Sequence, residues 1–332
     1  MRLAASSEPG IYLRSYLGPL QAFLEREDVT DIYVNRPHEV WIETLKGGIE
    51  RYEVTGLDSA TLERLARQIA AHTHQGINRE HPLLSATLPN GSRVQVILPP
   101  ATRGDLAMAI RKHVVSDLSL ADYLANGGFE RTQFQSGSSD DKNADIAKFL
   151  QDGDFASALA LAVRERRNIL VSGGTSTGKT TFLNALMREI PAEERLILIE
   201  DTPELRVEHE NAVGLLATRG VLGEAQVTAD DLVSASLRMR PDRIILGELR
   251  GGEAYAFLRA INTGHPGSMT TVHADSAENA VEQIVLLVLQ TGTRLSRDDV
   301  RHYVSQTIDL YVQLERKAGE RWIGEVNCRL KL

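Results

Sequence analysis

A glycine-rich stretch in the middle of the chain has the composition and spacing of a phosphate-binding loop. It fits the pattern G-x-x-x-x-G-K-[ST], and it stands between an apolar stretch and a helix-forming one. The glycines let the backbone wrap around an anion, and the following helix points its free N–H groups at that anion. We expect Lys179 to reach the β and γ phosphates of ATP, and the Thr180 hydroxyl to bind Mg²⁺. The residues predicted to hold the nucleotide are Gly173, Gly174, Thr175, Ser176, Thr177, Gly178, Lys179, Thr180 and Thr181.

Carboxylates follow two apolar stretches further along the chain. Glu200 and Asp201 follow residues 196–199, and Glu248 follows residues 244–247. In a parallel sheet both places lie at the carboxyl ends of strands, the edge where ligands bind. We expect Glu248 to position the attacking water. Glu200 is the second candidate, and both carboxylates would reach the metal through water. Either could instead be a solvated loop carboxylate, and Asp201 could simply cap the next turn.

His273 closes another apolar stretch, residues 268–272. A lone histidine is usually a packing or surface group, but its place at a strand end beside a phosphate site favours a role as a sensor of the γ phosphate. No cluster of His, Cys or carboxylate residues in the sequence has the spacing of a metal site. The histidines at 72, 74 and 81 are interpreted as surface residues.

The elements that must position these residues alternate between helix and strand from Ala144 onward. Continuous β-branched stretches at 168–172, 196–200, 243–247 and 268–272 alternate with helical patterns, including one after Gly178 and one over 228–239. This alternation predicts an α/β fold, a parallel sheet covered on both faces. Residues 308–314 and 322–330 flank a turn and predict a hairpin.

The first part of the chain has a different pattern, which predicts a smaller α+β domain. Short strands at 31–34 and 40–43, a helix after Asp58 and an Asn90-Gly91 turn between two β-prone stretches indicate an antiparallel sheet with helices. Ser119 and Asp122 form a plausible capping box. We therefore expect an N-terminal domain over 1–130, a linker over 131–143 and a P-loop domain over 144–332. The polar segment could also be a long surface loop within one domain.

Composition limits the function classes. The 332 residues carry a formal charge of −8, which argues against general binding to nucleic acids. The single cysteine, Cys328, cannot form an intrachain disulfide or a cysteine-based zinc site, so a reducing compartment is expected. The first ten residues do not resemble a signal peptide, and the longest apolar stretch, Val281–Leu289, is too short to span a membrane. A membrane role would require a partner.

Four blocks in order resemble the traffic ATPases of type IV secretion systems, the VirB11-type members of the secretion ATPase superfamily. They are Gly173–Thr181 (Walker A), Leu196–Leu205 (Asp box), Leu237–Glu253 (Walker B) and Thr263–Ala274 (His box). In the N-terminal half, Val34–Pro37, Leu88–Val96 and Ile110–His113 are also similar to the family. The resemblance covers most of the chain, and the polar segment is its weakest stretch. As in this superfamily, Gly247-Glu248 replaces the aspartate usual after the Walker B strand, which leaves open which group holds magnesium through water.

The resemblance implies a RecA-like P-loop domain in a hexameric ring at the cytoplasmic face of a bacterial inner membrane. Such a ring would hydrolyse ATP with Mg²⁺ to power assembly of, or transport through, a secretion or conjugation apparatus, by moving the N-terminal against the C-terminal domains. Its partners would be inner-membrane components and the coupling ATPase. In this family, arginines at the positions of Arg93 and Arg111 reach the nucleotide between the domains. These two could instead be solvated sheet arginines.

Other functions remain open at this point. A pilus motor or a type II secretion motor belongs to the same superfamily, although type II motors usually carry a tetracysteine segment and Cys328 stands alone. A small-molecule kinase would use the same P-loop, but it would leave the Walker B and His blocks unexplained. A nucleotide-gated scaffold that hydrolyses slowly or not at all is a third alternative. Neither the cargo nor the oligomeric state of the isolated protein follows from the sequence.

Overall fold

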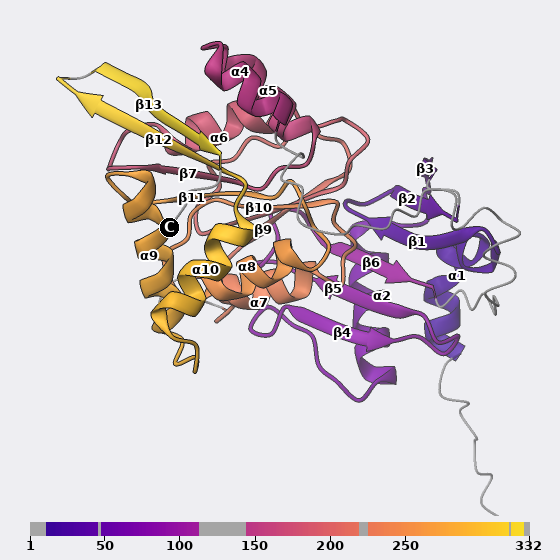
Figure 1. The fold of residues 1–332 in the computed structure, drawn as a ribbon. Helices are drawn as coiled ribbons and strands as arrows, with labels where there is room; N and C mark the ends of the chain where they lie inside the picture. The colour runs from indigo at the N-terminus through magenta and orange to yellow at the C-terminus, as the bar shows by residue number, and fades with distance from the viewer. Residues whose placement is uncertain (1–10, 46–47, 113–143, 219–224, 319, 329–332) are drawn as a thin grey trace, which may run out of the picture.

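The computed structural model describes residues 11–45, 48–112, 144–218, 225–318 and 320–328. The predicted capping box at Ser119 and Asp122 and the predicted linker 131–143 lie outside these residues. Two sheets lie next to one another, an N-terminal sheet and a larger C-terminal one (Figure 1). No helix in the described part of the chain is long and apolar enough to cross a membrane.

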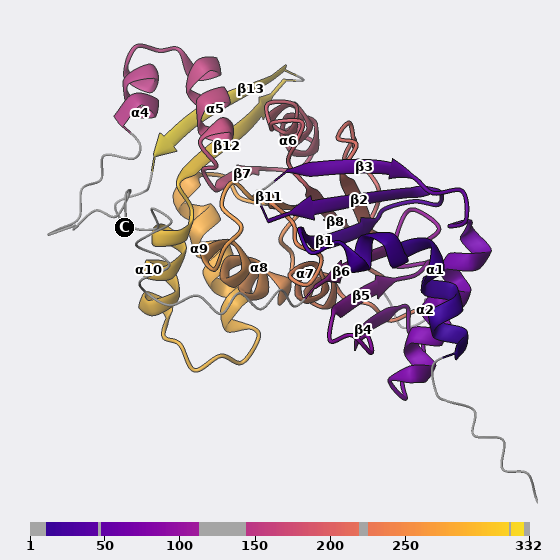
Figure 2. The same ribbon diagram turned by 90° about the vertical axis from the view of Figure 1, so that its right-hand side faces the viewer.

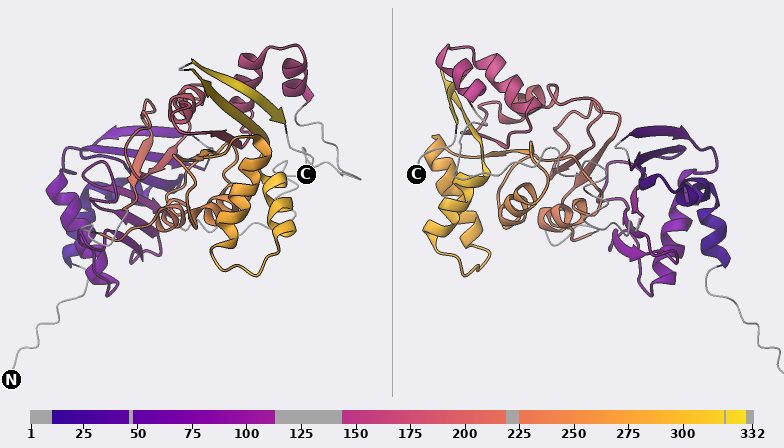
Figure 3. Two further views of the ribbon diagram at one scale, coloured as in Figure 1. Left: turned by 90° about the vertical axis from the view of Figure 1, so that its left-hand side faces the viewer. Right: turned by 45° about the vertical axis from the view of Figure 1, so that its right-hand side comes forward.

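The N-terminal sheet has six antiparallel strands in the order β3-β2-β1-β6-β5-β4. Its helix after Asp58 is confirmed: the Asp58 carboxylate caps α2 by accepting the Thr61 N–H at 2.7 Å. The apolar stripe of α2 packs with α1 on one face of the sheet, the outer face in Figure 3. The elements are α1 (Ile11–Glu25), β1 (Val29–Val34), β2 (Glu39–Thr44), β3 (Ile49–Glu53), α2 (Ser59–His72), β4 (Leu83–Thr87), β5 (Arg93–Ile97) and β6 (Ala107–Arg111).

The C-terminal sheet has seven strands in the order β13-β12-β7-β11-β10-β8-β9. All its neighbours are parallel except β12 and β13, which form the hairpin predicted from the sequence. The elements are α4 (Ala144–Gln151), α5 (Phe155–Arg164), β7 (Ile169–Gly173), α6 (Lys179–Met187), β8 (Leu196–Glu200), β9 (Ala212–Leu216), α7 (Ala229–Ser236), β10 (Arg243–Leu246), α8 (Glu253–Asn262), β11 (Met269–Val272), α9 (Ala277–Leu289), α10 (Arg297–Thr307), β12 (Leu310–Lys317) and β13 (Glu320–Cys328).

Helices cover both faces of this sheet, which confirms the predicted α/β class. Helices α4, α5 and α6 pack on one face, and α7, α8, α9 and α10 pack on the other (Figure 2). Such double coverage explains why the central strands are continuous apolar stretches, because both sides of each strand are buried. Strand β9 was not predicted, since its alternating burial and central Gly214 give a weak strand pattern.

The second face of the N-terminal sheet packs against the C-terminal domain. Tyr33, Trp41 and Ala109 belong to the same buried cluster as Leu215 and Leu232 of the C-terminal domain. The two domains therefore share a hydrophobic core within this chain. That shared core fixes which elements of the N-terminal domain come near the P-loop.

Candidate active site

The P-loop joins the end of β7 to the start of α6. Gly178 caps α6 with φ 94°, a left-handed conformation that favours glycine. A Cβ on Gly173 would lie only 2.5 Å from Thr177 Oγ1, so a side chain there would displace the loop. The hydroxyl of Thr177 donates to the carbonyl of Gly174 at 3.0 Å, and Arg321 of the C-terminal hairpin donates to the carbonyl of Ser176 at 2.8 Å. The loop is thus held from within and from β13.

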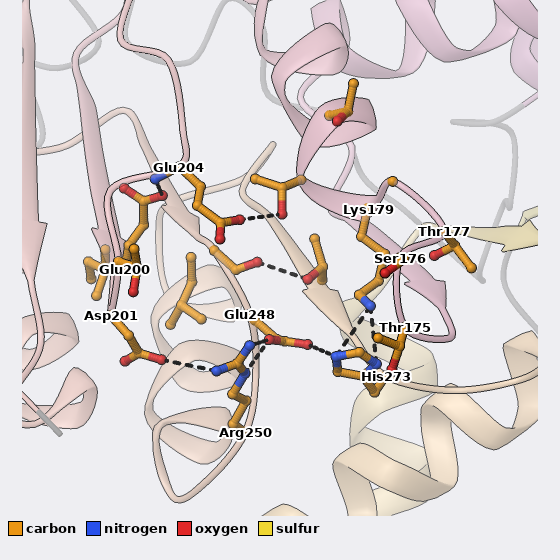
Figure 4. Close-up of a pocket in the computed structure, with 18 of the residues that line it drawn as sticks. Thr175, Ser176, Thr177, Lys179, Glu200, Asp201, Glu204, Glu248, Arg250 and His273 are labelled. Carbon is orange, nitrogen blue, oxygen red and sulfur yellow. Dashed lines mark hydrogen bonds and ion pairs between the residues drawn. The ribbon is translucent and has the colours of Figure 1, made fainter. Parts of the chain in front are cut away.

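A cavity of about 470 Å³ opens at the P-loop, a size typical of sites for small ligands. The carboxyl ends of β8, β10 and β11 form its other wall (Figure 4). This is the edge expected for ligand binding in a parallel sheet. The structure places all the predicted C-terminal site residues except Gly173 and Gly174 in the cavity lining: Thr175, Ser176, Thr177, Gly178, Lys179, Thr180, Thr181, Glu200, Glu248 and His273, with Asp201 beside them.

A chain of polar contacts runs across the cavity from the P-loop to β10 (Figure 4). Lys179 Nζ lies 3.2 Å from His273 Nδ1, and His273 Nε2 lies 2.8 Å from Glu248 Oε1. An ammonium group can only donate, so His273 accepts at Nδ1 and carries its proton on Nε2, where it donates to Glu248. Glu248 also pairs with Arg250, which lies 3.6 Å from Asp201. The three groups expected to act on the phosphate and the water are therefore linked by direct contacts, with His273 in the middle.

Lys179 is nearly buried, and it donates to the carbonyls of Gly173 at 3.0 Å and Gly174 at 3.3 Å. Burial lowers the pKa of Lys179, and the negative charge of Glu248 opposes that shift. A cation that is partly desolvated in this way interacts more strongly with phosphate oxygens than an exposed lysine does.

The residues near Thr180 fit a magnesium ion. Thr180 Oγ1 donates to Glu204 Oε2 at 3.0 Å, and hydroxyl and carboxylate oxygens are the donors that Mg²⁺ prefers. Across the described ranges, no group of three or more His, Cys, Asp or Glu side chains is arranged to hold a metal by itself. An ion beside Thr180 would therefore depend on phosphate oxygens and water for its other ligands.

Glu200 is engaged by the protein on both of its oxygens. Oε1 accepts the N–H groups of Glu204 at 2.9 Å and Leu205 at 2.7 Å, and Oε2 pairs with Arg103 of the N-terminal domain. The carboxylate is nearly buried behind the segment that follows β8. A role for Glu200 in holding magnesium through water stays a prediction. In the structure, Glu200 fixes the conformation of the segment 201–205 by accepting two of its N–H groups.

Arg93 and Arg111, which the resemblance places at the nucleotide between the domains, do not line this cavity in the single chain. They are direct partners across β5 and β6, and they line a second cavity of about 590 Å³ together with Leu237 and Arg238. Arg111 also pairs with Asp31 at 3.0 Å. Arg93 opens β5 and Arg111 closes β6, so both lie at the end of the sheet that faces the residues after α7. A role toward the nucleotide of a neighbouring subunit stays a prediction.

Four residues near the site were not predicted to act there. Glu204 and Arg250 stand inside the Asp-box and Walker B blocks, so their position in those motifs was an available signal. Arg103 and Arg321 lie outside every motif, and only the fold brings them close to the P-loop cavity.

Comparison with known proteins agrees with this fold. The family described as Type II/IV secretion system protein matches residues 15–320. The VirB11 type IV secretion system protein of Bartonella quintana is 40% identical over 97% of this chain and 94% of its own length. PtlH of Bordetella pertussis is 39% identical over 92% of this chain and 91% of its own. The crystal structure of the VirB11 ATPase from the Brucella suis type IV secretion system superimposes with a TM-score of 0.90 at 38% identity, over 96% of this chain and 95% of that one. The RecA-like P-loop fold with its smaller N-terminal domain is thereby confirmed, and the chain belongs to the type II/IV secretion system protein family.

Proposed function

We propose that this protein hydrolyses ATP to ADP and phosphate at the P-loop, and that the reaction drives a type IV secretion or conjugation apparatus. The observation that carries the proposal is the contact chain Lys179–His273–Glu248 across the mouth of the P-loop. A buried cation, an imidazole and a carboxylate in contact beside the P-loop support a site where the γ phosphate of a bound nucleotide and an attacking water would meet. A kinase would need an acceptor site instead of this arrangement.

The roles follow from the contacts. The backbone of the P-loop and Lys179 bind the β and γ phosphates, and Thr180 would hold Mg²⁺ through its hydroxyl, an ion that would neutralise phosphate charge. Glu248 orients the water and accepts its proton, held in place by His273 on one oxygen and Arg250 on the other. His273 bridges Lys179 and Glu248, so it is suited to respond to the charge of the γ phosphate.

The apparatus is proposed from the relatives, whose names place them in type IV secretion systems. We infer a homo-hexameric ring that lies at the cytoplasmic face of an inner membrane and contacts membrane components and a coupling ATPase. The domains proposed are 1–130 and 144–332, joined by 131–143. A pilus or type II secretion motor is the alternative within the family.

Two variants at the site test the proposed reaction. Lys179→Ala removes a phosphate contact, so both nucleotide binding and turnover should fall. Glu248→Gln keeps the size of the side chain but removes its charge, so binding should persist while kcat falls roughly 100- to 10,000-fold. Arg67→Ala, an exposed change on α2, is the control and should leave both unchanged. Wild-type turnover by Lys179→Ala would refute the assignment of the site.

A further inference from the structure

A loop of the N-terminal domain forms an added edge on the C-terminal sheet. Strand β9 ends the strand order, and residues 101–103 pair with it through an antiparallel bridge between Thr102 and Leu215. The Arg103 N–H donates to the carbonyl of Gly214 at 3.0 Å, and the Leu216 N–H donates to the carbonyl of Ala101 at 3.0 Å. Backbone pairing of this kind fixes the register of the loop against β9, because main-chain groups lie at defined positions along a strand. The side chain of Arg103 therefore enters the C-terminal domain at a defined point.

The C-terminal domain has room for that side chain because residue 214 is glycine. A Cβ on Gly214 would lie 2.5 Å from Arg103 Cδ and 2.9 Å from its Nε. Glycine weakens the interior of a strand, and it often marks a site where another group approaches the backbone closely. The close passage of the Arg103 side chain over the β9 backbone is such an approach.

The guanidinium of Arg103 holds the segment that follows β8 through two contacts. Nη2 pairs with Glu200, and Nη1 donates to the carbonyl of Leu205 at 3.1 Å. Glu200 in turn accepts the Leu205 N–H at 2.7 Å and the Glu204 N–H at 2.9 Å. Both main-chain polar groups of Leu205 are thus fixed, one directly by Arg103 and one through Glu200.

The same segment touches the predicted metal ligand. Glu204 accepts the Thr180 hydroxyl at 3.0 Å, and its carbonyl accepts Asn184 Nδ2 of α6 at 3.3 Å. A path of direct contacts therefore runs from Arg103 through Glu200 and residues 204–205 to Thr180. A shift of the segment would move Glu204, the carboxylate that accepts the Thr180 hydroxyl and so orients its oxygen.

We propose that Arg103 is a positioning residue of the nucleotide site. It holds Glu200 and residues 201–205 against the first turn of α6, and it thereby couples the binding of nucleotide with magnesium to the docking of the N-terminal domain. Arg103 does not itself line the P-loop cavity, so it acts through Glu200 and Leu205. The inference rests on the proposed function and adds a residue that no motif contains. Its guanidinium shape matters because one group must serve both a carboxylate and a carbonyl.

The test compares three changes in the full-length protein. Arg103→Ala removes both contacts, Arg103→Lys keeps a charge for Glu200 but cannot serve both acceptors, and Gly214→Ala displaces the Arg103 side chain without altering it. Arg51→Ala is the matched control, since Arg51 also joins the domains, at 3.1 Å from Glu210, but leads to no residue of the site. Affinity for ATP is measured by calorimetry with and without Mg²⁺, together with KM and kcat, and urea unfolding shows that each variant is folded.

We expect Arg103→Ala and Gly214→Ala to weaken ATP binding roughly tenfold in Mg²⁺, with a smaller change in its absence. KM should rise by a similar factor while kcat stays within about threefold of the wild type. Arg103→Lys should fall between Arg103→Ala and the wild type, and Arg51→Ala should match the wild type. If Arg103→Ala does not fold, Gly214→Ala and Arg103→Lys carry the test.

Two results would overturn the proposal. One is wild-type ATP affinity and KM in folded Arg103→Ala or Gly214→Ala. The other is an equal loss in Arg51→Ala, which would mean that any weakening of the domain interface has the same effect. Failure of the proposed function would give a different result, because Lys179→Ala would then match the wild type in turnover. In that case the calorimetric comparison still decides the role of Arg103, and a wild-type chain that binds no ATP would refute both.

Discussion

Tyr33 stands at the contact between the two domains, and replacing it tests whether they share a core in solution as they do in the structure. Its ring is 1% exposed, and the guanidinium carbon of Arg195 lies 4.0 Å from the ring centroid. The Tyr33 hydroxyl donates to Glu43 at 2.8 Å. Arg195 is itself buried, and it donates to the carbonyl of Met239 and to Oδ1 of Asn211. Truncation of Tyr33 therefore removes the packing partner of a buried cation.

The size of the effect follows from these contacts. Removing a buried aromatic side chain costs roughly 3–5 kcal/mol, a figure that includes the cavity left behind. Loss of the attraction between the ring and the desolvated guanidinium, about 2 kcal/mol, is part of that total. Tyr33→Phe keeps the ring over Arg195 and loses one hydrogen bond to a carboxylate, about 1.5–3 kcal/mol. We expect Tyr33→Ala to lower the free energy of unfolding by about 2 kcal/mol more than Tyr33→Phe does.

Urea unfolding followed by tryptophan fluorescence measures this difference. The chain has two tryptophans, Trp41 in the shared core and Trp322 on the hairpin, so a Trp322→Phe background makes Trp41 the sole reporter. Unfolding at two protein concentrations separates packing within a chain from packing between chains, because only the second depends on concentration. A cost below about 1 kcal/mol for Tyr33→Ala would place Tyr33 at an exposed surface, and the shared core would then be refuted.

Three further outcomes are expected. Gly173→Ala should lower ATP affinity roughly tenfold or more, because the added Cβ would lie 2.5 Å from Thr177 Oγ1; unchanged affinity in a titration would contradict the tight loop geometry. Arg93→Ala and Arg111→Ala should each weaken ATP more than ADP if a neighbouring subunit uses them, and equal effects on both nucleotides would remove that role. A protein beginning at Ala144 should turn over slowly at matched oligomeric state, and full activity would exclude a catalytic part for the N-terminal domain.

The sequence predicted the P-loop and the residues opposite it well, for a physical reason. Each of these groups stands at the end of an apolar stretch, and strand ends of a parallel sheet meet at one edge. Glu248 and His273 could therefore be placed near Lys179 from the strand pattern alone, although their direct contact could not. The β12–β13 hairpin and the helix capped by Asp58 followed from equally local patterns.

What the sequence could not show depends on how the domains dock. Arg93 and Arg111 were correctly placed on strands, but the strand pattern does not tell which cavity the end of the sheet faces. Arg103 was missed because its role depends on Gly214, more than a hundred positions later, and on a buried Glu200. Pairings of this kind carry no periodicity and no fixed spacing along the chain.

Arg195 and Arg103, two of the arginines that join the domains, differ in how readily their contacts can be broken. Arg195 is fully buried beneath the Tyr33 ring and donates to Asn35 Oδ1 at 2.9 Å, so pulling the domains apart there would deprive a buried cation of both partners. The Arg103 side chain is 23% exposed and lies at the sheet edge, where water can replace its contacts with Glu200 and Leu205. A rocking motion that keeps Arg195 in place while releasing Arg103 is therefore the less costly movement of the N-terminal domain. Because the release of Arg103 frees the segment that contacts Thr180, such a movement would alter the surroundings of the residue proposed to bind magnesium. ATP-driven domain motion and the geometry of the nucleotide site would then be linked through one side chain.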